Sequence, residues 1–197
     1  MKFTLPNFQS SKNAAEFEEL GYTYLTNIVD KETCEDFAKE MLYLKATNKL
    51  TAEDRGQLAA ANVDPGVYKP SYGFGGVAKF NEYLNFISKP LADRIGVNWK
   101  DKHCYCRIYY NGGMLGKHVD RPGLDYTLSI TLLSTLTKPF PLYVIDKKGN
   151  TVDADTKVGD GILILGTKMQ HWREPLVCEP HECCIQLFMH WSYPETA

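Results

Sequence analysis

The stretch from 126 to 133, Tyr-Thr-Leu-Ser-Ile-Thr-Leu-Leu, alternates hydroxyl-bearing and aliphatic side chains. Because successive side chains of a β-strand point to opposite faces, this pattern predicts a strand with one polar and one aliphatic face. Four more short runs that are aromatic, β-branched or apolar predict further strands at 104–110, 142–145, 162–165 and 184–191. Turns rich in glycine and aspartate separate these runs. Short strands with regular turns predict a β-sandwich or barrel in the second half of the chain.

The first hundred residues show a mainly helical pattern. Residues 21–28 predict an early strand, and Asp30 can cap a helix that follows it. Apolar residues at helical spacing predict two helices, one through Cys34, Phe37, Ala38, Met41 and Leu42 and one through Phe80, Tyr83, Leu84 and Ile87. Pro90 is expected to interrupt or end the second helix. Between the two helices, the breaker-rich residues 64–76 predict a long loop, either an active-site lid or a packed surface loop.

Composition excludes several classes of protein. The 197 residues indicate one domain, and 22 basic against 24 acidic residues give a net charge of −2. This balance argues against a mainly electrostatic binder of nucleic acid or anionic membranes, although a local basic groove is compatible with it. The six cysteines form no C-x-x-C pair, which favours free thiols in a reducing compartment. Residues 1–17 have no apolar core and no apolar run is long enough to span a bilayer, so we expect a soluble cytoplasmic protein.

A possible metal site follows from three residues. His118 and Asp120 lie in the segment Gly-Lys-His-Val-Asp (116–120), and two residues that are two apart in a strand share a face. His171 comes 51 residues after Asp120, behind the apolar run at 162–165. Two imidazoles and one carboxylate on one side of a metal are the ligand set of non-haem Fe(II) oxygenases. Catalytic zinc with the same three ligands is the alternative.

The flanking sequence resembles a known family. The segment Tyr-Tyr-Asn-Gly-Gly-Met-Leu-Gly-Lys-His-Val-Asp-Arg-Pro (109–122) is similar to the metal-binding stretch of Fe(II)/2-oxoglutarate-dependent dioxygenases of the prolyl 4-hydroxylase type, in which a Tyr stands nine residues before the first ligand His. Segments 141–143, 159–161, 170–176 and 186–191 resemble the second half of that family. The resemblance implies an α+β fold: a double-stranded β-helix, that is, a jelly-roll or cupin-like barrel, with N-terminal helices packed on one sheet. Residues 1–197 would form a single dioxygenase domain, with helical support and a lid loop at 1–100 and the barrel core with its metal site at 101–197.

The resemblance also implies roles for individual residues. His118, Asp120 and His171 would bind Fe(II), and Tyr109 would hydrogen-bond the distal carboxylate of 2-oxoglutarate. The family normally places a Lys or Arg about ten residues after the second ligand histidine, where this chain has His181.

This departure leaves three candidates for the cation that pairs with that carboxylate: Arg173, Arg107 and His181. We prefer Arg173 and then Arg107, because a guanidinium can bind a carboxylate with two parallel hydrogen bonds. Thr131 or Ser129 would add a hydroxyl to the same carboxylate, unless these residues are only packed strand hydroxyls.

The activity that the resemblance implies is hydroxylation of a C–H bond with Fe(II), 2-oxoglutarate as co-substrate and O₂. The substrate would be a peptidyl residue, prolyl included, or a small molecule, with no nucleic-acid or membrane partner and with the oligomeric state left open. A non-catalytic cupin-like module that binds a metal or ligand is one alternative. A nucleic-acid demethylase is the other, disfavoured by the net charge and by the lack of an Asn-x-x-x-Arg stretch after the second ligand histidine.

Overall fold

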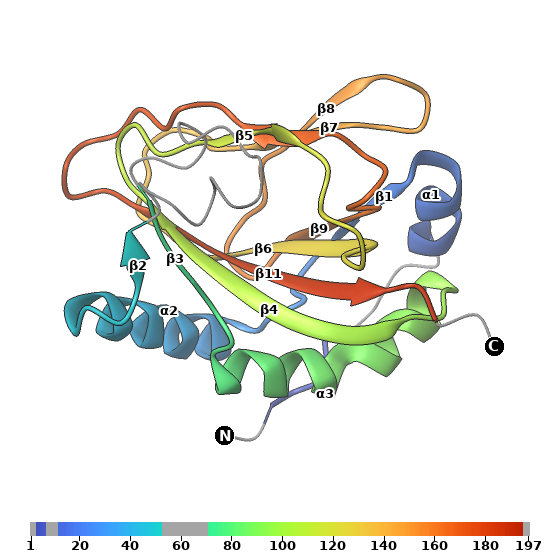
Figure 1. Ribbon diagram of the computed structural model, residues 1–197, viewed down its shortest axis with the longest axis horizontal. Helices are drawn as coiled ribbons and strands as arrows, with labels where there is room; N and C mark the ends of the chain where they lie inside the picture. The colour runs from blue at the N-terminus through green and yellow to red at the C-terminus, as the bar shows by residue number, and fades with distance from the viewer. Residues whose placement is uncertain (1–2, 7–11, 53–70, 195–197) are drawn as a thin grey trace.

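The structure is a computed structural model that describes residues 3–6, 12–52 and 71–194 (Figure 1). Its helices are α1 (Lys12–Leu20), α2 (Lys31–Ala46) and α3 (Ala78–Ile95). Its strands are β1 (Tyr22–Leu25), β2 (Thr51–Ala52), β3 (Ser71–Gly75), β4 (Lys100–Tyr109), β5 (Leu115–His118), β6 (Tyr126–Ser134), β7 (Leu142–Ile145), β8 (Thr151–Ala154), β9 (Gly161–Ile164), β10 (His171–Arg173) and β11 (Cys184–Ser192).

The strands form two antiparallel sheets that lie over one another. The major sheet has seven strands in the order β1-β9-β6-β11-β4-β3-β2, and the minor sheet has four in the order β5-β10-β7-β8. Helices α2 and α3 cover one face of the major sheet, and the minor sheet lies on the opposite side (Figure 1). The predicted α+β class, with helices packed on one sheet, is therefore confirmed. A closed barrel is not confirmed, since no strand pairing among the described residues joins the two sheets.

The alternation in β6 determines what each face of the major sheet buries. Leu128, Ile130 and Leu132 pack in the main hydrophobic core, which also contains the buried residues of α2 and α3. Thr127, Ser129 and Thr131 point the other way, toward the minor sheet, and all three are buried. The polar row predicted from the sequence therefore lines the space between the two sheets, where a site can form.

The two long helices follow local sequence signals except at one proline. The Asp30 carboxylate accepts a hydrogen bond from the backbone N–H of Thr33 at 2.9 Å, which caps α2 as predicted. Pro90 does not end α3; the helix continues to Ile95 and stops at Gly96, whose φ of +76° suits glycine. The buried stripe continues beyond the proline through Leu91 and Ile95. Packing of this stripe against the sheet compensates for the hydrogen bond that proline cannot donate.

The breaker-rich segment is only partly a loop. Residues 71–75 form β3, which pairs with β4 in the major sheet, although we predicted a loop there. The backbone of Gly73 and Gly75 lies opposite Arg107 and Tyr105, so ladder hydrogen bonds outweigh the weak strand preference of glycine. The rest of the predicted lid, up to residue 70, lies outside the described residues.

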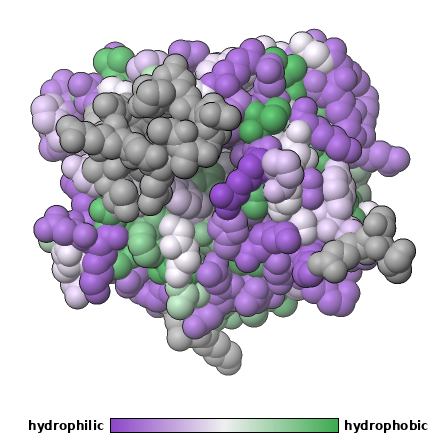
Figure 2. Space-filling model, in the orientation of Figure 1, coloured by the Kyte–Doolittle hydropathy of each residue, from purple (hydrophilic) through white to green (hydrophobic). Residues whose placement is uncertain are grey.

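The surface in Figure 2 is mainly hydrophilic and the cysteines are free, as the composition predicted. Hydrophilic residues predominate on the face shown in Figure 2, and apolar residues show through in separate areas. All six cysteines lie in the described ranges and are free, five of them buried. Across those ranges, no helix has both the length and the apolar character to cross a membrane.

Candidate metal centre

Strand pairing brings the three predicted ligands together. His118 is the last residue of β5 and His171 the first of β10, and the two residues are direct partners in this antiparallel pair. Asp120 lies two residues beyond the end of β5, so the shared strand face that we predicted for 118 and 120 is not how they meet. Instead, the backbone N–H of Asp120 donates to Gly166 O at 2.9 Å, which holds the turn after β5 against the end of β9.

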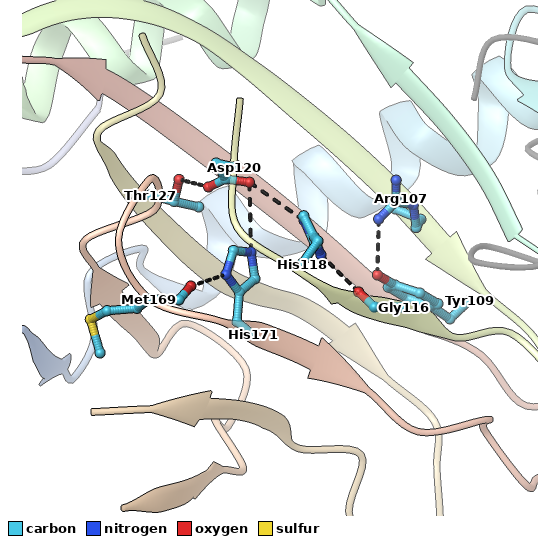
Figure 3. Close-up of polar contacts among 8 residues, drawn as sticks. All are labelled: Arg107, Tyr109, Gly116, His118, Asp120, Thr127, Met169 and His171. Atoms are coloured by element: carbon cyan, nitrogen blue, oxygen red, sulfur yellow. Dashed lines mark hydrogen bonds and ion pairs between the residues drawn. The ribbon is translucent and has the colours of Figure 1, made fainter. Parts of the chain in front are cut away.

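The three side chains point at one another (Figure 3). Nε2 of His118 and Nε2 of His171 each lie 3.6 Å from Asp120 Oδ1. All three ligand atoms lie within 4.8 Å of one another. The described residues contain no other such group of His, Cys, Asp or Glu side chains. A metal ion placed among these atoms would have open positions on its other side.

Backbone carbonyls fix the orientation of both imidazoles. Nδ1–H of His118 donates to Gly116 O at 2.8 Å, and Nδ1–H of His171 donates to Met169 O at 2.9 Å. These bonds leave each Nε2 with its lone pair directed to the centre of the group (Figure 3). Second-shell contacts of this kind are typical of histidines that bind a metal.

The carboxylate is equally well positioned. Thr127 Oγ1 donates to Asp120 Oδ2 at 2.5 Å, so that Oδ1 is the oxygen that faces the imidazoles. Burial alone would raise the pKa of Asp120, but the interactions of its carboxylate with the His118 and His171 side chains outweigh it and hold the pKa below its ordinary value. The group is therefore an anion at neutral pH, as a metal ligand requires.

Gly166 is a supporting residue that the sequence did not reveal, because its role depends on a contact between distant segments. A Cβ at this position would meet Leu124 O at 2.6 Å and Thr127 Oγ1 at 2.7 Å, and would come closer still to Asp120 Oδ2.

We predict that Gly166→Ala displaces the Asp120 carboxylate from the group. Metal affinity is expected to fall by about 10–100-fold, as when a second-shell partner is lost. The free energy of unfolding should fall by about 1–3 kcal/mol through overpacking. Calorimetric metal titration and denaturant unfolding measure the two effects. Gly149→Ala is the matched control for unfolding, since a Cβ there meets nothing within 4 Å although its positive φ adds strain. Full metal affinity in Gly166→Ala would contradict the supporting role.

Arg173 lies in the same strand as His171 and is buried, with 2% of its surface exposed. Its Nη1 donates to Phe140 O, and its Nη2 lies 3.1 Å from Gln186 Oε1 and 3.5 Å from Ser129 Oγ. Within the described ranges, its Nε has no hydrogen-bond partner. Burial lowers the pKa of Arg173, and no carboxylate in the described chain forms an ion pair with it. A buried guanidinium with an unsatisfied N–H donor fits a site that binds an anion, because burial of an unpaired cation is costly.

Tyr109 and Arg107 lie beside Arg173. The Tyr109 hydroxyl accepts a hydrogen bond from Arg107 Nη1 at 3.1 Å (Figure 3). The guanidinium carbons of Arg107 and Arg173 lie 5.6 and 5.9 Å from the centre of the Tyr109 ring. The structure thus brings all three predicted residues to one region between the sheets.

Thr131 and His181 are farther from this region. Thr131 Oγ1 accepts from Gln186 Nε2 at 2.9 Å and contacts Thr156 at 2.8 Å, so it reaches Arg173 only through Gln186. His181 is exposed in the loop before β11, which removes it from the choice of cations. Gln186 itself was missed, although one signal was present: a single amide in a mainly apolar strand.

A second buried histidine lies close to the metal group. His190 is 6% exposed, and its Nδ1 lies 3.2 Å from the backbone oxygen of His103. Burial lowers the pKa of His190 to about 4, although the negative charge of Asp120 acts in the opposite direction. Between the unfolded value of about 6.5 and the folded value, the unfolded chain binds the extra proton, so stability falls as the pH falls through this window.

We predict that His190→Phe reduces this acid sensitivity. The fall in the free energy of unfolding between pH 7 and pH 5 should be smaller by roughly 2 kcal/mol than in the native sequence. Urea unfolding at the two pH values, with a chelator present, measures the difference. An unchanged pH dependence would mean that His190 titrates normally.

Comparison with known proteins gives a match in structure alone. No protein-family model matches the chain, and no curated protein matches it. A prolyl-4-hydroxylase from Pseudomonas putida superposes with a TM-score of 0.72 at 13% identity, covering 93% of this chain and 98% of that one. A prolyl hydroxylase from Trichoplax adhaerens, in complex with a hypoxia inducible factor peptide fragment, gives 0.69 at 16% identity over 92% and 89%. HygX from Streptomyces hygroscopicus, with nickel and 2-oxoglutarate bound, gives 0.66 at 11% identity over 95% and 89%.

The chain therefore has the fold of the 2-oxoglutarate-Fe(II) oxygenases, with prolyl-4-hydroxylases among the structures most like it. The resemblance seen in the sequence is confirmed at the level of the fold. At 10–16% identity, these similarities establish the fold alone.

Proposed function

We propose that the protein is a non-haem Fe(II) and 2-oxoglutarate-dependent dioxygenase that hydroxylates a C–H bond of a peptidyl residue, prolyl included, or of a small molecule. One observation supports this above the others: His118, Asp120 and His171 converge beside buried Arg173, whose Nε has no hydrogen-bond partner among the described residues. We further propose that residues 1–197 act as one dioxygenase domain whose two sheets are those of a double-stranded β-helix. The free thiols fit a cytoplasmic location.

The donor set fits iron. Two neutral imidazoles and one carboxylate suit Fe(II) and leave room for further ligands. Bound Fe(II) and 2-oxoglutarate would supply the oxidising chemistry, consuming O₂ and releasing succinate and CO₂. The protein contributes the positions of the groups and the exclusion of water.

Arg173 and the polar side chains near it fit the distal carboxylate of 2-oxoglutarate. Arg173 would provide the positive charge and its free Nε–H, and Tyr109 a hydroxyl. Of the two candidate strand hydroxyls, that of Ser129 is nearer to Arg173, and Thr131 would act through Gln186. Arg107 would orient the Tyr109 hydroxyl through its hydrogen bond.

Apolar residues keep this space dry. Phe188 lies on the inner face of β11, and Ile162 and Ile164 lie opposite Ser129 and Thr127 on β6; all three apolar residues are buried. Exclusion of water strengthens the charge interactions of a bound dicarboxylate and protects reactive species.

We propose two classes of substrate, peptides and small molecules. One similar structure is a complex with a peptide fragment and another is a complex with hygromycin B. A non-catalytic cupin-like module is disfavoured because the Nε2 atoms are oriented for a metal and the buried cation is oriented for an anion.

Anaerobic titration with Fe(II) and 2-oxoglutarate tests the proposal. A visible charge-transfer band that needs both components is expected. Absence of the band from folded protein would favour the binding module.

A further inference from the structure

A cleft of about 260 Å³ lies beyond Arg173, on the side away from the candidate metal group. Its floor includes Thr131 of β6 and Gln186 of β11. Thr131 lies four residues along β6 from Thr127, the residue that hydrogen-bonds Asp120, which corresponds to a separation of about 13 Å along the strand. The cleft and the metal group are therefore separate places, and the cleft has no part in the proposed function.

A chain of hydrogen bonds connects the buried guanidinium of Arg173 to this cleft. Arg173 Nη2 donates to Gln186 Oε1 at 3.1 Å, and Gln186 Nε2 donates to Thr131 Oγ1 at 2.9 Å. Because a guanidinium can only donate, the Gln186 amide presents its oxygen to Arg173 and its NH₂ group to Thr131. The next member is Thr156, whose Oγ1 lies 2.8 Å from Thr131 Oγ1. The chain therefore runs outward from the cation.

The last hydroxyl of the chain can donate into the cleft. Thr131 is 3% exposed, and Thr156 Oγ1 is the acceptor that the described residues offer to its O–H. If Thr156 donated to Thr131 instead, the Thr131 hydrogen would be buried without an acceptor, which is unfavourable. Thr131 therefore donates to Thr156, which is partly exposed and lines the cleft. The O–H of Thr156 is left for an acceptor inside the cleft.

Backbone hydrogen bonds hold the segment that carries Thr156. The N–H of Gly159 donates to Thr131 O at 2.9 Å, and the N–H of Thr131 donates to Asp160 O at 3.1 Å. These bonds fix residues 156–160 beside β6. The donor is therefore positioned before any ligand binds, which reduces the entropy cost of binding.

Positive charge surrounds this donor. Arg173 polarises the chain that ends at Thr156, which makes the final O–H a stronger donor. Lys138 and Lys157 also line the cleft, and both are exposed. Among the described lining residues Asp155 is the one carboxylate, so basic groups outnumber acidic ones. The cleft is thus suited to an acceptor with negative charge.

We infer that this cleft binds a small carboxylate or phosphate, which accepts the Thr156 O–H and lies near Lys138 and Lys157. The inference goes beyond the proposed function and does not depend on it, because no metal takes part. Hydrogen bonds to a charged acceptor are stronger than those between neutral groups, so an anion gains more from this donor than a neutral ligand does. The volume is below that of pockets for drug-sized ligands and suits a small anion.

Three small probes test the inference: acetate, methyl phosphate and acetamide, the neutral analogue of acetate. Metal-free protein is titrated with each probe and followed by NMR, so that no probe can bind to a metal ion. At least one anion should bind at least about tenfold more tightly than acetamide. The largest shifts should occur in the backbone amide signals of residues 134–138 and 155–158. Preference for acetate or for methyl phosphate distinguishes the two kinds of anion.

Thr156→Val shows whether the hydroxyl is responsible. This variant removes the O–H with little change in volume, and it should lower the preference for the anion to below about threefold. Thr151→Val is the matched control, since Thr151 is exposed at the other end of β8 and does not line the cleft. This control should keep the full preference. The amide spectrum of each variant shows whether it is folded.

A double variant, Lys138→Gln with Lys157→Gln, shows whether the charge is responsible. It should also lower the preference to below about threefold. Lys31→Gln with Lys39→Gln is its matched control, because it removes two exposed charges from α2, on the other side of the major sheet. The helix lies against that sheet in Figure 1.

Equal binding of acetamide, no anion binding up to about 50 mM, or an unchanged preference in either cleft variant would overturn the inference. Shifts centred on Ser129 and Arg173, with residues 155–158 unaffected, would also overturn it, because the anion would then bind at Arg173 itself. The titration uses neither Fe(II) nor 2-oxoglutarate, so its failure is distinct from failure of the proposed function.

Discussion

Replacing His118 with alanine is expected to abolish metal binding and the charge-transfer band that requires Fe(II) and 2-oxoglutarate together. His118 provides one of three ligand atoms, and its Nε2 is already directed at Asp120 Oδ1 from 3.6 Å. Loss of a second-shell partner costs about 10–100-fold in metal affinity, so loss of a ligand should cost more than about 100-fold. Anaerobic calorimetry with Fe(II) and visible absorbance measure the two effects.

His181→Ala is the matched control, because it removes an exposed histidine from the loop before β11. This variant should keep both the band and the affinity. Circular dichroism should show that His118→Ala is folded, since the side chain is partly exposed and lies at a strand end. If folded His118→Ala keeps the band or any turnover of 2-oxoglutarate, the metal assignment is wrong.

The sequence predicted the strands that show a period or a continuous apolar or aromatic run. The alternation at 126–133, the apolar runs at 142–145 and 162–165, and the aromatic runs of β4 and β11 all became strands near the expected bounds. These patterns arise because the side chains of each strand are buried against a neighbouring sheet or helical layer. Each pattern is therefore visible within its own segment of the sequence. The polar inner row of β6 was predicted on the same basis and lines the candidate site.

Strands β5 and β10 of the minor sheet could not be predicted in this way. β5 has four residues and β10 has three, too few for a period to be visible, and neither is a continuous apolar run. Yet the pairing of His171 with His118 across these strands is what assembles the candidate metal group. The sequence indicated the ligand residues through their chemistry and the family resemblance, whereas the supporting contacts of Gly166 and Gln186 join segments far apart in the chain.

Arg173→Ala is expected to raise the dissociation constant of 2-oxoglutarate far more than Arg107→Ala does. Removing one partner from a buried ion pair costs about 3–5 kcal/mol, which corresponds to a rise of more than about 100-fold. Arg107 would contribute through its hydrogen bond to Tyr109, so its loss should raise the constant by less than about tenfold. Calorimetric titration of the Zn(II)-loaded variants gives both constants without turnover.

Arg173→Lys separates charge from geometry. Lysine would keep the positive charge but lose the planar fork and the Nε–H that has no partner in the described chain. Its affinity for 2-oxoglutarate should fall between that of the native protein and that of Arg173→Ala. If Arg107→Ala instead shows the larger loss, the role of pairing with the distal carboxylate passes to Arg107. Arg173 would then be a structural cation held by Phe140, Gln186 and Ser129.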